Sequence, residues 1–407
     1  MPALQGLRIL DLSRVLAGPW ATQLLSDLGA DVIKIERPGV GDDTRHWGPP
    51  NLTDSAGQPT AEAAYYLAAN RGKRSVAVDL STPGGQEVIR ALAAQSDVVV
   101  ENYKVGQLAK YGLDYASLSA LNPRLVYCSI TGFGQTGPYS HRPGYDYIIQ
   151  AMSGFMSITG ERDGLPGAGP QKAGVAIADL FTGLYSLIAI LAAIEQRHST
   201  GRGQHIDMAL FDTMVAALAN MNTNTLIGGF TPRRAGNAHG NVVPYQVFEA
   251  ADTPFVLAVG NDGQFARLCD VGGRPELAAD PRFARNEDRI VHRAELIPEL
   301  AAMIRTRPAA YWLEALEAAC VPAGPINTIP QALADPQILS RGLRIDLPHP
   351  LSGQVPLVGM PIRMSDSPPA YHRSPPLLGQ HTDEVLRELA GFDDDRLAAL
   401  RAAGAIG

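Results

Sequence analysis

The segment 172–186, KAGVAIADLFTGLYS, contains a single carboxylate, Asp179, among small and apolar residues. An aspartate has an ordinary pKa of about 3.9, so it is ionised at neutral pH and can act as a nucleophile without an activating base. The apolar run after it predicts a helix, and Asp is a favoured N-cap. The residues alone leave both roles open. The two are compatible, because a helix N-terminus stabilises a carboxylate.

Basic side chains follow several predicted strands. Ligands of open α/β sheets bind outside the carboxyl ends of the strands, and Arg37 directly follows a strand predicted at 31–36. Its planar fork suits a phosphate, although a solvated surface arginine is the alternative. Comparable places hold Arg71, Lys73, Arg74, Lys104 and Lys110. Together these groups predict binding of a polyphosphate ligand.

The first loop gives a dinucleotide site only partial support. A Rossmann nucleotide fingerprint needs GxGxxG, whereas the loop 13–19, SRVLAGP, has only Gly18. Glu36 does stand where a ribose-binding acid would be expected. An NAD-dependent oxidoreductase therefore remains a distant alternative.

The first third of the chain alternates between strand and helix patterns. Helices are predicted at 19–29 and 81–95, and strands at 7–12, 31–36, 75–80, 97–102 and 125–132. Strands separated by helices of this length predict an α/β fold with a mostly parallel sheet. The segment 38–60, rich in Gly, Pro and Asn, is predicted to be a long irregular connection.

A composition shift at 226–244 marks a domain boundary, because Gly, Asn and Pro replace the preceding helical pattern. The next block mixes short strands with helices predicted at 287–305 and 309–319, and the chain then returns to extended pieces and a C-terminal helix. The predicted domains are 1–225, a large ligand-binding domain; 226–329, a small domain; and 330–407, a return to the large domain.

Composition excludes several classes of protein. The net charge of -7 provides no basic field for nucleic acid. Three scattered Cys predict a reduced, cytoplasmic compartment, and nine His without HxxxH or HExxH spacing predict no metal site. The start of the chain lacks a signal-peptide pattern, and the apolar run 180–194 is shorter than the roughly 20 residues of a membrane span. A buried core helix and no membrane are expected.

Six segments stand in the order of a known family: GLRILDLSRVLAGPWATQLLSDLGADVIKIERPGVGDDTR, NRGKRSVAVDL, SDVVVENY, LNPRLVYCSITGFGQTGP, ADLFTGLYSLIAILAAIEQRHSTGRGQHIDMALFD and PPLLGQHTDEVL. The chain resembles the family III CoA-transferases, which include formyl-CoA and carnitine CoA-transferases and 2-methylacyl-CoA racemases. The resemblance implies a Rossmann-like large domain built from both chain ends, a smaller α+β domain, and an interlocked homodimer with CoA near its interface.

The resemblance also implies roles for residues. Asp179 would attack an acyl-CoA thioester to give an aspartyl anhydride, then an aspartyl-CoA thioester that the acceptor acid resolves. Coenzyme A and acyl-CoA would be substrates, with no permanently bound cofactor. The implied CoA-contacting positions are Leu16, Ala17, Arg37, Val78, Leu80, Asn102, Tyr103, Lys104, Lys110, Tyr145 and Asp146. An apolar surround would protect the anhydride from water.

Tyr145 favours a transferase over a racemase. The racemases carry a His before the catalytic Asp, whereas the matching stretch here is RPGYDYI, with Tyr145 in that place. A tyrosine has an ordinary pKa of about 10 and is a poor base at neutral pH. A 2-methylacyl-CoA racemase or epimerase stays as the alternative function.

The middle of the chain looks most like the succinyl-CoA:glutarate-type members. The relevant stretches are GNAHGNVVPYQVF and PAGPINT, and the glycine lid of formyl-CoA transferases is reduced to Gly236 and Gly240. The resemblance implies succinyl-CoA as donor and a dicarboxylic acid as acceptor. A cation for the second carboxylate could come from Arg233, Arg234 or His239, with a solvated loop as the alternative for each.

Overall fold

The computed structural model describes residues 1–407, and these form two compact units. Unit 1 consists of 1–155, 172–230 and 339–407, whereas unit 2 consists of 156–171 and 231–338. The breaks between the units at 230/231 and 338/339 compare with predicted domain boundaries at 225/226 and 329/330. The segment 156–171 differs from the prediction, since it clusters with unit 2 rather than with the large domain.

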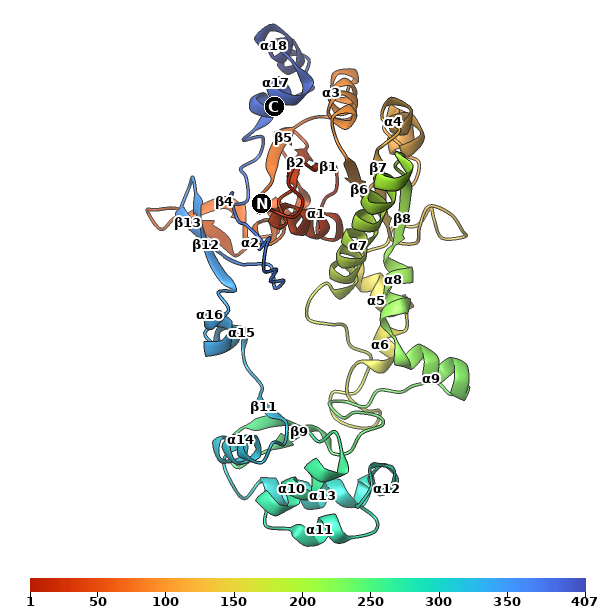
Figure 1. Cartoon of the computed structure of the whole chain (residues 1–407), viewed down its shortest axis with the longest axis vertical. Helices are drawn as coiled ribbons and strands as arrows, with labels where there is room; N and C mark the ends of the chain where they lie inside the picture. The colour runs from red at the N-terminus through yellow and green to blue at the C-terminus, as the bar shows by residue number, and fades with distance from the viewer. The chain divides into compact units, whose positions relative to one another are not determined.

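Unit 1 is built on a six-stranded parallel sheet (Figure 1). Its strands, in spatial order, are β5 (Arg74–Ala77), β2 (Asp31–Glu36), β1 (Arg8–Asp11), β6 (Val98–Glu101), β7 (Val126–Thr131) and β8 (His205–Ala209). Every neighbouring pair is parallel. The predicted α/β class with a mostly parallel sheet is therefore confirmed.

Both faces of this sheet are covered by helices, because alternate side chains along each strand enter different cores. Ile9, Val98 and Val100 pack toward one face, whereas Leu10 and Val99 pack toward the other. The first face is covered by α1 (Ala17–Asp27), α7 (Ile177–Thr200) and α8 (Leu210–Ala217). The second face is covered by α3 (Pro83–Ala94), α4 (Tyr115–Leu121), α17 (Thr382–Ala390) and α18 (Asp394–Ala402).

Helix α7 contains the predicted run 180–194 and extends beyond it at both ends. By length and composition it could cross a membrane, a criterion that core helices also meet. Ile190 and Ala193 are buried in the core of the first face, whereas Leu184 and Ile188 are exposed, so α7 is only in part the buried core helix that was expected. At Gly183 a Cβ atom would lie 2.8 Å from the Ala17 carbonyl oxygen, so α1 and α7 approach at backbone distance near the start of α7.

The segment 38–60 contains more structure than predicted. A short 3₁₀ helix, η1 (Asp43–His46), is followed by a hairpin of β3 (Asn51–Thr53) and β4 (Pro59–Ala63), which leads into α2 (Ala64–Leu67). The hairpin turn is held by Asp54, whose carboxylate accepts from the amides of Ala56 and Gln58. The strands are too short to show alternation in the sequence.

Unit 2 contains an antiparallel three-stranded sheet with helices packed around a core that includes Phe255 and Trp312. Its strands are β9 (Tyr245–Glu249), β10 (Pro254–Ala258) and β11 (Ala323–Pro325). Its main helices are α10 (Asp262–Val271), α11 (Pro275–Ala279), α12 (Asn286–Val291), α13 (Arg293–Ile304) and α14 (Ala309–Ala318). The helix predicted at 287–305 is thus two helices that meet at His292.

The remaining elements are short. In unit 1 they are η2 (Leu108–Tyr111), α5 (Asp146–Met152), α9 (Asn220–Gly228), α16 (Pro336–Ser340) near the unit boundary, β12 (Arg344–His349) and β13 (Gly353–Val358). The helices α6 (Phe155–Ile158) and α15 (Ile329–Leu333) lie at or within unit 2. Figure 1 shows α17 beside α3, where the end of the chain rejoins the sheet.

A buried ion pair supports the loop between β1 and α1. The Lys34 ammonium lies 2.8 Å from the Asp42 carboxylate and donates to the Ser13 carbonyl oxygen at 3.1 Å. Both side chains of the pair are fully buried. Asp42 also accepts from the Val15 amide at 3.2 Å. The buried Lys34–Asp42 pair therefore fixes the backbone of the loop 13–16.

We expect Asp42→Ala to lower the free energy of unfolding by about 3–5 kcal/mol, because it leaves the Lys34 charge buried without its partner. The matched control is Asp43→Ala, whose side chain is half-exposed and pairs with the half-exposed Arg14. That control should cost about 1 kcal/mol or less. Urea denaturation of both variants measures the difference, and equal losses would contradict this account of the pair.

Candidate active site

A cavity of about 240 Å³ in unit 1 contains Asp179. It opens at the carboxyl ends of β6 and β7, where parallel sheets bind their ligands. Of the predicted positions, the cavity brings together Ala17, Asn102, Tyr103, Lys104, Tyr145, Asp146 and Asp179. Residues from four separate parts of the sequence thus meet at one site.

Asp179 is in the first turn of α7 but does not cap it. The N-cap position is Ala176, and the free Ala178 amide donates at 2.7 Å to the Asp146 carboxylate from α5. Asp146 also accepts from the Gln150 side-chain amide at 2.6 Å, and Gln150 in turn accepts from the Ala173 amide at 2.8 Å. The expectation that Asp179 is the N-cap is wrong, because a side chain 32 residues away in the sequence takes that role.

Burial raises the pKa of Asp179 to about 7, and the negative charge of Asp146 contributes in the same direction. A carboxyl with this pKa is only partly ionised at neutral pH, whereas full ionisation was expected. The first-turn position of α7 favours the charged form, but the loss of hydration outweighs it. The carboxyl group is held where small changes of pH or of nearby charge switch its protonation.

Tyr65 does not line the cavity but lies close enough for the charges of Asp179 and Asp146 to act on it, which the sequence did not reveal. Burial raises the pKa of its phenol, and the negative charges of Asp179 and Asp146 raise it further. Its ring lies 5.1 Å from that of Trp47 in an edge-to-face arrangement. Tyr65 lies in α2, directly after the β3–β4 hairpin, most of which belongs to the segment 38–60 that was predicted to be an irregular connection.

The loop 13–16 has a strained backbone at the edge of the cavity. Val15 adopts a φ of 70°, which is unfavourable for a β-branched residue. The Asn102 side chain fixes the backbone of Arg14, the residue before Val15. It donates to the Arg14 carbonyl oxygen at 2.7 Å and accepts from the Arg14 amide at 2.9 Å. Asn102 was predicted to contact CoA; its amide is occupied in positioning this loop.

The other predicted CoA contacts lie outside the cavity. Val78 and Leu80 are buried in the hydrophobic core of unit 1, so the structure does not bring their side chains to the site. Arg37 and Lys110 are exposed, the first near Asp79 and the second in η2. Leu16 is buried at the N-cap of α1, next to Ala17 of the cavity.

Three basic residues considered for phosphate binding form ion pairs within the protein instead, and those of Lys73 and Arg71 are buried. Lys73 lies 3.0 Å from Asp11, Arg71 binds Asp27, and Arg74 binds Asp31. Within the described chain, no group of three or more His, Cys, Asp or Glu side chains is arranged to hold a metal ion.

The segment 140–146 supplies residues that sequence reasoning missed, among them His141 and Arg142. It packs backbone to backbone on the end of β7, because a Cβ atom at Gly132 would lie 2.4 Å from the Gly144 Cα atom. The only signal for this contact is a glycine in each segment, which does not identify its partner.

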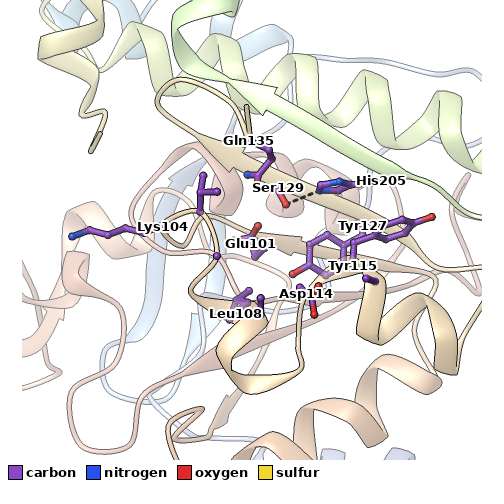
Figure 2. Close-up of a pocket in the computed structure, with 13 residues that line it drawn as sticks. Glu101, Lys104, Leu108, Asp114, Tyr115, Tyr127, Ser129, Gln135 and His205 are labelled. Carbon is purple, nitrogen blue, oxygen red and sulfur yellow. Dashed lines mark hydrogen bonds between the residues drawn. The ribbon is translucent and has the colours of Figure 1, made fainter. Parts of the chain in front are cut away.

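A second cavity of about 320 Å³ adjoins the first, and Lys104 and Val105 line both. Figure 2 shows the Lys104 side chain extending away from Glu101, Ser129 and His205. The Ser129 hydroxyl and His205 Nε2 are hydrogen-bonded at 2.9 Å. Burial raises the pKa of Glu101 to about 7, although this carboxyl accepts from the Tyr103 amide at 2.7 Å. Glu101 lines the second cavity, and its hydrogen bond from the Tyr103 amide helps to position Tyr103, which lines the first cavity.

Comparisons with known proteins agree with this geometry. Residues 4–382 match CoA-transferase family III. A succinate–glutarate CoA-transferase of Agrobacterium fabrum is 54% identical over 388 residues, covering 95% of this chain and 96% of that protein. The succinyl-CoA:glutarate CoA-transferase of Mus musculus is 44% identical, covering 100% and 91%. The crystal structure of a CAIB/BAIF family protein from Brucella suis is 51% identical with a TM-score of 0.84, covering 95% and 99%.

The chain belongs to CoA-transferase family III. It is accordingly an enzyme of the CoA-transferase class, as the resemblance of its motifs implied. The alternative of an NAD-dependent oxidoreductase, which rested on Glu36, is not supported. Glu36 is buried and binds the Arg45 guanidinium at 2.8 Å.

We expect Asp146→Asn to move the pH dependence of the enzyme to lower pH. Asp146 raises the pKa of Asp179 by its charge, so the neutral amide should let Asp179 ionise at lower pH while still accepting from the Ala178 amide. If Asp179 reacts as a carboxylate, kcat/KM for the acyl-CoA donor should rise with pH around 7 in the native enzyme, and this limb should report Asp179. A limb that stays in place or moves to higher pH would show that Asp146 does not control Asp179.

Proposed function

We propose that this enzyme transfers CoA from succinyl-CoA to a dicarboxylic acid, with Asp179 as the covalent nucleophile. The observation that carries the proposal is the carboxylate in the first turn of α7, desolvated enough that its pKa rises to about 7. The names of relatives at 54% and 44% identity, with nearly complete coverage, support the donor and acceptor.

In the proposed reaction, Asp179 attacks the thioester carbonyl of the donor and expels the CoA thiolate, forming an aspartyl–acyl anhydride. The thiolate attacks the aspartyl carbonyl, which releases the donor acid and forms an aspartyl-CoA thioester. The acceptor carboxylate then displaces the thiolate and forms a second anhydride. Attack of the thiolate on the acyl carbonyl of this anhydride gives the new acyl-CoA and regenerates Asp179. No proton is consumed overall.

The cavity supports these steps in two ways. Desolvation strengthens a carboxylate nucleophile and keeps water from the anhydrides. Lys104 presents a charge for a CoA phosphate at the strand ends, and Ala17, Tyr103 and Tyr145 line the route to Asp179. Arg37 and Lys110 remain candidates for phosphates beyond the cavity. We propose that CoA and acyl-CoA are substrates and that no cofactor is permanently bound.

A Rossmann-like large domain is part of the proposal. Numbered among themselves, the sheet strands follow the order 3-2-1-4-5-6, which is that of doubly wound nucleotide-binding folds. Cys128, Cys269 and Cys320 are free thiols, which supports a reduced, cytoplasmic location.

We also propose a homodimer, interlocked as in the family. Large apolar residues of α7 and α9 are exposed, among them Ile188 at 61%, Leu226 at 84% and Ile227 at 83%. A surface of this kind marks an interaction site, and a second copy of the chain is the proposed occupant. Light scattering of the purified protein tests this, and a monomeric mass would refute it.

His141 favours a second candidate function. An acyl-CoA racemase needs a base beside the α-carbon, and although Tyr145 replaces the racemase His, His141 lines the same cavity. The racemase predicts deuterium uptake at the α-carbon of 2-methylacyl-CoA in heavy water without an acceptor acid. Transfer that requires an acceptor, with no deuterium uptake, leaves the transferase.

We expect Asp179→Asn to reduce transfer from succinyl-CoA to glutarate on the order of 10³-fold or more, because the amide cannot form the anhydride. The fold should survive. A carboxyl whose pKa is raised on folding costs stability as pH rises from its unfolded value toward about 7, so at pH 8 the variant should melt no lower than the native enzyme. Chromatography of the CoA esters and thermal melting test both points; near-normal turnover would refute the nucleophile.

A further inference from the structure

Arg142 is a cation of the Asp179 cavity without a carboxylate partner in the chain. Its neighbour in the cavity, Arg14, is already neutralised by Asp43 at 2.9 Å. A positive charge that lines a catalytic cavity and has no internal partner is available for an anionic group of the substrate.

Two aromatic rings hold the Arg142 side chain. Its guanidinium carbon lies 4.7 Å from the centre of the Tyr139 ring and 5.8 Å from that of Phe133. The two rings meet edge to face at 5.5 Å, and Phe133 packs on Phe211 at 5.7 Å. Rings engage the flat face of a guanidinium and leave its N–H edge free, so Arg142 can bind a carboxylate without leaving this platform.

The backbone places Arg142 close to the nucleophile. Asp146 follows four positions after Arg142 in the chain, a stretch that spans at most about 14 Å. Asp146 is bonded to the amide that precedes Asp179, and Gly144 is packed against Gly132 at the end of β7. Both ends of the short connection are therefore anchored, and Arg142 and Asp179 line the same cavity.

We propose that Arg142 binds the carboxylate at the far end of a dicarboxylic acyl chain and thereby selects diacids over monoacids. This rests on the proposed transferase function and adds a specificity residue to it. In a diacid of five carbons the carboxyl carbons are about 5 Å apart, so one carboxylate reacts at Asp179 while the other pairs with the guanidinium edge.

A CoA phosphate is the competing partner for Arg142. Lys104 is better placed for that role, because it follows β6 and lines both cavities, whereas Arg142 belongs to the segment that carries Tyr145 and Asp146. We therefore assign Lys104 to a CoA phosphate and Arg142 to the carboxylate of the acyl chain.

The test compares Arg142→Gln with the native enzyme for glutarate and for pentanoate, which ends in a methyl group. Because the acceptor reacts with the covalent CoA–enzyme, its kcat/KM does not depend on the donor. We expect kcat/KM for glutarate to fall about 10- to 100-fold, the loss of a charged hydrogen-bonded pair. The value for pentanoate, or its inhibition constant if turnover is slow, should stay unchanged, as should the affinity for free CoA.

Arg142→Lys should show an intermediate loss, since it keeps the charge but not the fork. Arg202→Gln, which removes an exposed arginine with no side-chain partner, is the matched control and should behave as the native enzyme. Thermal melting checks that each variant is folded. Equal losses for glutarate and pentanoate, weaker CoA binding, or no loss would overturn the proposal. Failure of the native enzyme to use glutarate would instead refute the proposed function.

Discussion

The site depends on the hydrogen bond from the Ala178 amide to the Asp146 carboxylate. This contact gives α7 the N-terminal partner that its own sequence lacks, and it ties α5 to the helix that carries Asp179. It also brings a second negative charge close to Asp179, the proposed nucleophile, and this charge contributes to the raised pKa of Asp179. One contact thus helps to position Asp179 and adds to the effect of burial on its pKa.

The loop 13–16, which also lines the cavity, is fixed by a different set of contacts. The loop 13–16 keeps Val15 in an unfavourable conformation, and such strain persists only where the surroundings define the backbone completely. Here the Asn102 side chain binds the Arg14 backbone. The buried Lys34–Asp42 pair binds the backbone of Ser13 and Val15. A backbone held so firmly can present its surface to a thioester with little reorganisation.

The sequence predicted the elements whose patterns are local. The strand at 31–36 and the apolar helix after Asp179 have clear patterns and appear where expected. Strands β3 and β4 are too short for a pattern, and their absence from the prediction also concealed Tyr65. Asp179 was predicted as a site residue because the segment ADLFTGLYS resembles the family motif, and the structure places it in the lining of the cavity.

The chemistry of that residue could not be read from the sequence. Its pKa depends on burial and on Asp146, and its supposed capping role belongs to that same distant side chain. Val78 and Leu80 show the same limit, because matching a motif does not reveal that the side chains face the core. The sequence did not indicate a role for Arg142, because its contacts with Phe133 and Tyr139 at the cavity form only in the folded chain.

The central claim is that Asp179 becomes covalently attached to CoA. The direct measurement is mass spectrometry of peptides from enzyme mixed with succinyl-CoA in the absence of an acceptor and quenched in acid. The account predicts CoA in thioester linkage on the peptide that contains Asp179, and its loss when glutarate is added. Exchange of label between succinate and succinyl-CoA with that peptide unmodified, or with the adduct on another residue, would contradict it.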